Sequence, residues 1–178
     1  MLTSLAAMTL IVQAGLPAWD FDNADALAVW TPNGHVEDAR VEAGVLHART
    51  TDWDPFFTCA GLEIPARPWQ YVTIRMRASE PGRGELFWTG RTAGKYGGFT
   101  QKKRTPFRAP GGEWTEVTLN TGWHGEGVVR KLRLDLYEGA DFAIDWIRVR
   151  SWGADSPPRT EGYAWRSPDD GLLHGWRR

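Results

Sequence analysis

One acidic residue lies inside an apolar stretch near the end of the chain, FAIDWIRVR, residues 142–150. The alternation predicts a β-strand with Asp145 on a face of small and branched apolar residues, namely Ala143, Ile147 and Val149. The other face is apolar too, and an unpaired buried carboxylate is costly. We therefore expect Asp145 to bind a metal ion, to accept backbone hydrogen bonds, or to pair with an arginine such as Arg148 or Arg130.

Two further stretches, YVTIRMRA and KLRLDLY, alternate in the same way. Their apolar faces carry Val72, Ile74, Met76, Leu132, Leu134 and Leu136, and their polar faces carry Arg75, Arg77, Arg133, Asp135 and Tyr137. If these strands are neighbours and Trp88 of GELFWTG lies nearby, guanidinium and carboxylate groups lie beside aromatic rings. Sugar hydroxyls pair with such polar groups and sugar C–H faces stack on such rings, so we expect a carbohydrate site. The alternative is cross-strand salt bridges over a core that contains the tryptophans.

Two predicted loops add aromatic and titratable groups. In DWDPFF, the proline after Asp54 favours a turn that presents Asp54 and Trp53 at a site rim, or else an Asx-type turn with the aromatic residues in the core. In TGWHGEG, glycines flank Trp123, which we also expect to contact sugar. His124 and Glu126 of this loop form the nearest approach to an acid/base pair.

The elements that position these residues are short strands with period-two alternation, separated by PGRG, PGGE and EGAD turns. We find no helix of three turns. This pattern predicts an all-β fold, an antiparallel β-sandwich of the jelly-roll type. VEDARVEAGVLHART predicts two of the strands, with a turn at residues 42–44, and TGRTAGKYGGFTQKKRTPF predicts a long basic connection.

Composition limits the class of function. The 178 residues are 42% hydrophobic and suit one core. The net charge of −1 and the lack of a long basic block argue against nucleic-acid binding. Cys59 is the single cysteine and the four histidines are scattered, so the sequence predicts neither a disulfide nor a zinc site. The 11 tryptophans supply core volume and flat surfaces for stacking.

The two ends differ from the body of the chain. Residues 1–18 are an apolar run that ends in small residues, which predicts a signal peptide rather than a membrane span and hence a secreted or periplasmic protein; a cytoplasmic protein is the alternative. We assign residues 19–152 to the sandwich. Residues 153–178 are a predicted linker, ADSPPRTEG, and a short tail.

The order of WDFDNADALAVW, GVLHARTTDWDPFF, YVTIRMRA, ELFWTG, GEWTEVTLN, KLRLDLY and FAIDWIRVR resembles carbohydrate-binding-module-like jelly rolls with a galactose-binding-domain-like fold, over roughly residues 19–150. The resemblance implies a secreted, non-catalytic module that binds polysaccharide and is often joined to an enzyme. It also implies a structural calcium ion, held between the first and last strands by Asp20, Asp22 and Asp145.

Two other functions stay open. Jelly rolls also include polysaccharide lyases and glycosidases, and the carboxylates available for such chemistry are Asp52, Asp54, Glu126 and Asp135, although no spacing singles out a pair. No hydrolase elbow, zinc-protease motif or phosphate loop is present in the sequence. The third class is a structural or protein-interaction sandwich within a larger assembly, with Trp165 and Trp176 of the tail as contacts.

Overall fold

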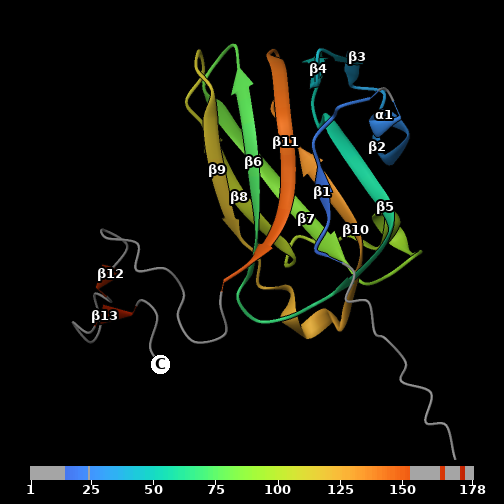
Figure 1. Ribbon diagram of the computed structural model, residues 1–178, viewed down its shortest axis with the longest axis vertical. Coiled ribbons are helices and arrows are strands. Elements are labelled where there is room, and N and C mark those ends of the chain that lie inside the picture. Colours follow the sequence, from blue (N-terminus) through green and yellow to red (C-terminus); the bar gives the residue numbers. More distant parts are fainter. Residues whose placement is uncertain (1–14, 24, 153–164, 167–172, 175–178) are drawn as a thin grey trace, which may run out of the picture.

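The computed structural model describes residues 15–23, 25–152, 165–166 and 173–174. Residues 15–152, apart from residue 24, form two packed antiparallel sheets (Figure 1). The first sheet has the order β3-β4-β11-β6-β9, and β1 also pairs with β11. Its strands are β3 (Val36–Glu42), β4 (Val45–Thr50), β11 (Asp141–Ser151), β6 (Gln70–Ala78), β9 (Thr115–Asn120) and β1 (Ala18–Trp19). The predicted all-β jelly-roll sandwich is therefore confirmed.

The second sheet has the order β2-β5-β10-β7-β8 and lies behind the first in Figure 1. Its strands are β2 (Trp30–Pro32), β5 (Phe56–Pro65), β10 (Val128–Asp135), β7 (Gly82–Thr89) and β8 (Arg104–Ala109). The short helices are α1 (Ala26–Val29), η1 (Lys95–Gly98) and η2 (Trp123–Glu126). Beyond the sandwich, β12 (Trp165–Arg166) pairs with β13 (Leu173–His174).

The inward faces of both sheets form one apolar core. Val72, Ile74 and Met76 of β6 and Leu132 and Leu134 of β10 are fully buried, as the alternation predicts. The β3–β4 hairpin turns at Ala43 and Gly44, which have φ values of 51° and 78°, in the left-handed region that such a turn requires.

The predicted alternation of β11 is wrong in its second half, because a β-bulge interrupts the strand. Opposite β6, Ile144 pairs with Met76 and Trp146 pairs with Arg75, so Asp145 is the extra residue between them. The bulge reverses the faces beyond it. Ile147 and Val149 lie in the core together with Ile144, and Asp145 does not share their face.

The ends of the chain fall mostly outside the described residues. Residues 1–14 of the predicted signal peptide and most of the predicted linker and tail belong to this part. The sandwich begins slightly before residue 19, because Ala18 pairs with Arg148 and the carbonyl of Pro17 accepts a hydrogen bond from the N–H of Val149, at 2.9 Å. Among the described residues, no helix has the length and apolar character needed to cross a membrane.

Candidate functional site

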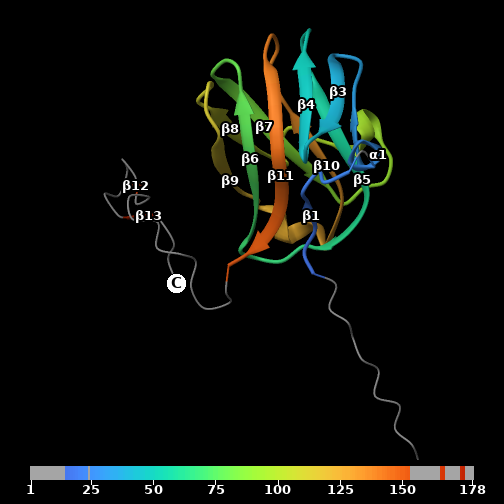
Figure 2. The ribbon, with the colours of Figure 1, turned by 45° about the horizontal axis from the view of Figure 1, so that its top comes forward.

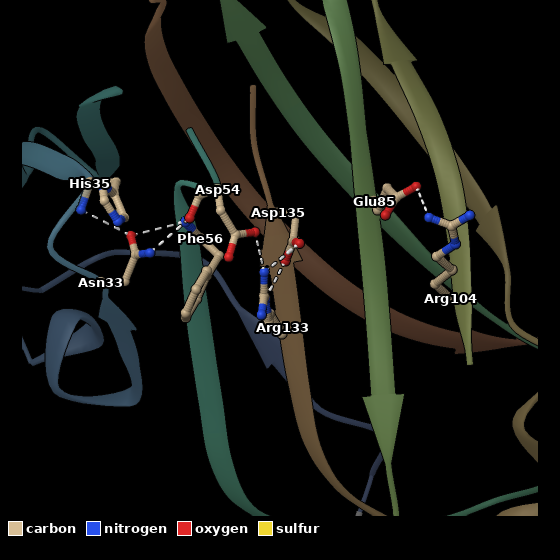
Figure 3. A network of polar contacts seen from close by, with 8 residues as sticks. All are labelled: Asn33, His35, Asp54, Phe56, Glu85, Arg104, Arg133 and Asp135. Carbon is tan, nitrogen blue, oxygen red and sulfur yellow. Dashed lines mark hydrogen bonds and ion pairs between the residues drawn. The ribbon is translucent and has the colours of Figure 1, made fainter. Parts of the chain in front are cut away.

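The outer face of the second sheet carries an arginine held between two carboxylates. Arg133 Nε lies 2.6 Å from Asp135 Oδ1 and Arg133 Nη2 lies 2.8 Å from Asp135 Oδ2, while Nη2 also donates to Asp54 (Figure 3). The guanidinium lies over the ring of Phe56, 3.7 Å from its centroid. Because the outward residues of β5 and β10 alternate with core residues, this arrangement fixes a planar donor on the sheet surface.

The ionisation of Asp135 reflects two opposing effects. Burial raises its pKa to about 6, from an ordinary 3.8, although the hydrogen bonds and charge of Arg133 act to lower it. The nearby charges of Asp54 and Glu85 raise the pKa further. The carboxyl group of Asp135 therefore changes from protonated to ionised near pH 6, above the ordinary range of an aspartate.

The loop before β5 places an exposed tryptophan at the edge of this face. The side chain of Asn33 fixes the loop: its Nδ2 donates to the carbonyl of Asp54 at 2.8 Å, and its Oδ1 accepts hydrogen bonds from the N–H groups of His35 and Phe56 (Figure 3). Trp53 is 67% exposed, and its ring centroid lies 5.7 Å from that of His35. The loop thus offers a flat ring to solvent beside the Asp54 carboxylate.

The face continues across β7 and β8. Glu85 of β7 forms an ion pair with Arg104 of β8 (Figure 3). At the far end of β10, Lys131 donates to the carbonyl of Gly97 in the long connection after β7, at 2.5 Å. The outer face of the second sheet is therefore a row of charged and hydrogen-bonding groups with one aromatic platform at its end.

Two of the predicted sugar-contacting tryptophans lie in the core. Trp88 is 5% exposed because it pairs with Leu132 on the inward face of the second sheet. Trp123 is 1% exposed, and its Nε1–H donates to Gln70 Oε1 at 2.8 Å. Their rings pack edge to face, so neither offers a ring face to solvent, and the core alternative holds for both.

The predicted polar faces of β6 and β10 do not meet. Arg75 and Arg77 lie on the outer face of the first sheet, whereas Arg133 and Asp135 lie on the second, because β6 pairs with β11 and β9, and β10 pairs with β5 and β7. Tyr137 follows β10, and its hydroxyl donates to the carbonyl of Glu80 at 2.5 Å. The condition for one site that joins all five residues, that the two strands are neighbours, is therefore not met. Of the predicted residues, Asp54, Arg133 and Asp135 come together, with Trp53 next to Asp54 in the chain.

Two of the three carboxylates assigned to calcium, Asp145 and Asp20, are paired with arginines. Asp145 Oδ2 lies 2.5 Å from Arg75 Nη1, and Asp20 Oδ1 accepts two hydrogen bonds from Arg148, at 2.9 and 2.5 Å. Among the described residues, no three acidic, histidine or cysteine side chains form a cluster that suits a metal ion. This arrangement does not fit the several free oxygen ligands of calcium, and a calcium ion at Asp20, Asp22 and Asp145 stays a prediction.

The candidate acid/base residues have structural partners. Glu126 accepts a hydrogen bond from the N–H of Gly90 at 2.9 Å and pairs with Lys103 at 2.5 Å. Burial acts to raise the pKa of Glu126, but the hydrogen bonds and charge of Lys103 and the Gly90 N–H outweigh it and lower the pKa. Burial raises the pKa of the Cys59 thiol to about 12, which makes it a poor nucleophile.

Sequence patterns missed several residues of this face, namely Asn33, Phe56, Glu85 and Arg104. The signals for two of them were available: Asn33 precedes a glycine in a turn, and Glu85 alternates with Leu86 in a strand.

A separate cavity of about 430 Å³ at the end of the sandwich was also missed; it is lined by Trp69, which is 40% exposed, and by His124 and Trp152.

Several solved structures have a fold similar to that of this chain. The module BiXyn10A CBM1 in its apo form aligns with a TM-score of 0.51 and 13% identity, over 77% of this chain and 97% of its own. The C-terminal CBM6 of the laminarinase LamC from Zobellia galactanivorans aligns with a TM-score of 0.50 and 14% identity, over 77% of this chain and 100% of its own. The agarase AgWH50C aligns with a TM-score of 0.57 and 10% identity, over 78% of this chain but 26% of its own.

No protein-family model and no curated protein sequence matches the chain. At these identities the alignments show the fold alone. The chain thus has the β-sandwich fold of carbohydrate-binding modules, and the predicted resemblance to their jelly rolls is confirmed.

Proposed function

We propose that this protein binds polysaccharide without cleaving it, through the outer face of the second sheet. The observation that carries the proposal is Arg133, fixed by Asp54 and Asp135 beside the exposed ring of Trp53. Arg133 Nη1 makes no hydrogen bond to another described residue, so it can donate to a sugar hydroxyl. Asp54, whose side chain is 41% exposed, can accept from a second hydroxyl, while a sugar C–H face stacks on Trp53.

The similar fold of the two modules supports this proposal, because both are named as carbohydrate-binding modules and align over nearly their whole length. The fixed geometry of Arg133 supports it independently, since a preorganised donor loses little conformational entropy on binding. A polar face with one exposed aromatic ring, that of Trp53, is suited to a single soluble polysaccharide chain.

The first test is affinity electrophoresis against neutral polysaccharides with wild-type protein, Trp53→Ala and Trp69→Ala. We expect Trp53→Ala to weaken retention at least tenfold, because the stacking of a sugar ring on the indole of Trp53 is lost. Trp69→Ala should change retention less than twofold. The reverse result would move the site to the cavity at the end of the sandwich. Release of sugar from any bound polysaccharide would instead establish the lyase or glycosidase alternative.

The calcium ion is proposed separately, on the resemblance alone. Retention and thermal stability measured in calcium and again in chelator test it. A loss of stability in chelator that Asp145→Asn abolishes would support calcium at Asp145. Equal behaviour in both buffers would leave Asp145 as the partner of Arg75.

We also propose that the protein acts outside the cytoplasm, since the apolar segment at residues 1–18 resembles a signal peptide. N-terminal sequencing of the exported protein tests this. We expect cleavage upstream of Pro17 rather than after residue 18, because Pro17 and Ala18 bond to β11 and so belong to the sandwich. We propose further that it can be part of a larger protein or assembly, as the aligned domain of the agarase AgWH50C is, where the alignment covers 26% of that chain.

A further inference from the structure

The outer face of the first sheet carries a shallow groove, on the side of the sandwich opposite the candidate sugar face. Ala143 of β11 forms part of its lining and pairs with His47 of β4 on one side and with Arg77 of β6 on the other. Figure 2 shows β4, β11 and β6 side by side in this layer. Two adjoining cavities, of about 290 and 230 Å³, share His47, Asp141 and Phe142.

Arg77 is oriented in this groove but not neutralised. Its guanidinium carbon lies 5.5 Å from the ring centroid of Trp114, which holds the side chain against the sheet. The next arginine along β6, Arg75, lies 5.2 Å from the same centroid and pairs with Asp145. Among the described residues, no carboxylate and no hydrogen-bond acceptor contacts Arg77. The groove thus contains one exposed arginine whose charge is not paired with a carboxylate of any described residue.

Of the other polar groups of the groove, Ser79 and His47 can donate, and Asp141 is a carboxylate that is paired with Arg49. The carboxylate of Asp141 accepts a hydrogen bond from Arg49 Nε at 3.3 Å. Ser79 Oγ accepts a hydrogen bond from the N–H of Asp141 at 3.0 Å, so its hydroxyl hydrogen points elsewhere. His47, on the opposite wall, adds a ring that can donate from one nitrogen. Arg77, Ser79 and His47 together favour a ligand that carries several acceptors and a negative charge.

We propose that this groove binds the acidic sugar units of a polysaccharide, through a carboxylate or a sulfate group. The planar fork of Arg77 suits two parallel hydrogen bonds to either anion, and Ser79 and His47 flank it. The small side chain of Ala143 leaves room for the sugar ring above the sheet. This site goes beyond the neutral polysaccharide binding proposed above and does not depend on it, because the two faces lie on opposite sheets.

The test measures binding of the full chain to two matched pairs of polymers at low salt: polygalacturonate against its methyl ester, and dextran sulfate against dextran. We expect binding to at least one of the two anionic polymers and weaker binding to its neutral partner. Arg77→Gln should weaken the anionic interaction about tenfold or more, because a charge-assisted bidentate contact is lost. The two pairs distinguish a carboxylate ligand from a sulfate ligand.

The matched control is Arg67→Gln, which removes an exposed arginine from the connection between β5 and β6. It should change the affinity less than twofold, and Trp53→Ala should leave it unchanged even if neutral polysaccharide binding is lost. If Arg77→Gln fails to fold, Arg77→Lys keeps the charge without the fork and should still weaken binding. Equal losses for Arg67→Gln and Arg77→Gln, or no binding to either anionic polymer, would overturn the proposal.

Discussion

At the scale of single residues, the geometry around Arg133 determines how Asp135 ionises. The folded protein binds a proton at Asp135 more tightly than the unfolded chain does, because burial raises the pKa of the carboxyl from 3.8 to about 6. Between these two values the folded state carries more protons, so the free energy of unfolding decreases as the pH rises through this range. Below pH 4 and above pH 6 this contribution is constant.

This pH dependence can be measured directly. A carbon-13 NMR titration should give Asp135 a midpoint near 6, and Asp54→Asn should lower it, since the charge of Asp54 raises the pKa. Urea denaturation should show that the stability change from pH 4 to pH 6.5 differs between the wild type and Asp135→Asn by about 1 to 3 kcal/mol. A midpoint near 4 would contradict the burial of this group.

The tryptophans give a second contrast at this scale. Trp123→Phe removes one of the two donors to the buried Gln70 Oε1, the other being the N–H of Arg67, and leaves a cavity where the larger indole ring packed. We therefore expect a loss of about 1 to 3 kcal/mol in the free energy of unfolding. Trp53→Ala removes an exposed ring and should change stability by less than about 0.5 kcal/mol. Urea denaturation of both variants measures the difference, and equal losses would argue against the burial described for Trp123.

At the scale of elements, the alternation of apolar and polar residues predicted the faces correctly in those strands that have a regular pleat. The faces of β6 follow the sequence pattern, and those of β10 follow it from Lys131 onward, after a register shift between Val129 and Lys131. The pattern failed in β11, since an inserted residue carries no marker of its own and reverses every face after it. It also failed for β5, whose run from Phe56 to Pro65 mixes core residues with Gly61 and Glu63.

The bulge at Asp145 gives a prediction for this scale. Deletion of Asp145 would remove the extra residue and leave Ile144, Ile147 and Val149 in regular alternation on the core face, so the protein should still fold. Asp145→Ala keeps the extra residue and loses only a partly exposed ion pair, with an expected cost of about 1 kcal/mol or less. Far-UV circular dichroism and urea denaturation compare the two variants. A deletion variant that fails to fold would show that the bulge itself is required and would contradict this prediction.

At the scale of the whole molecule, the fold class was predictable but the neighbours of each strand were not. Local alternation says which residues face inward, and says nothing about which strands pair. The polar rows of β6 and β10 therefore read alike in the sequence, although the sandwich places them on opposite surfaces. The exposed platform Trp53 and its partner Asp54 were predicted, because a proline in a short loop restricts the backbone.

The closed core predicts how the thiol reacts. Cys59 is fully buried between the sheets and its pKa is raised to about 12, so a thiol reagent should reach it only when the sandwich opens. We expect labelling at neutral pH to be slow and to accelerate in parallel with unfolding as urea is added. Mass spectrometry with a pulse of reagent measures this, and rapid labelling in water would show a local opening near β5.

The pairing of β1 with β11 has a consequence for how this sandwich can be joined to other proteins. Because Pro17 and Ala18 bond to the last strand at Arg148 and Val149, the chain enters and leaves the fold at neighbouring points. A domain with adjacent ends can be inserted into a surface loop of a host protein with little displacement of that loop. Such an insertion would leave both outer faces accessible, so that the domain could hold two polymer strands against one host at once.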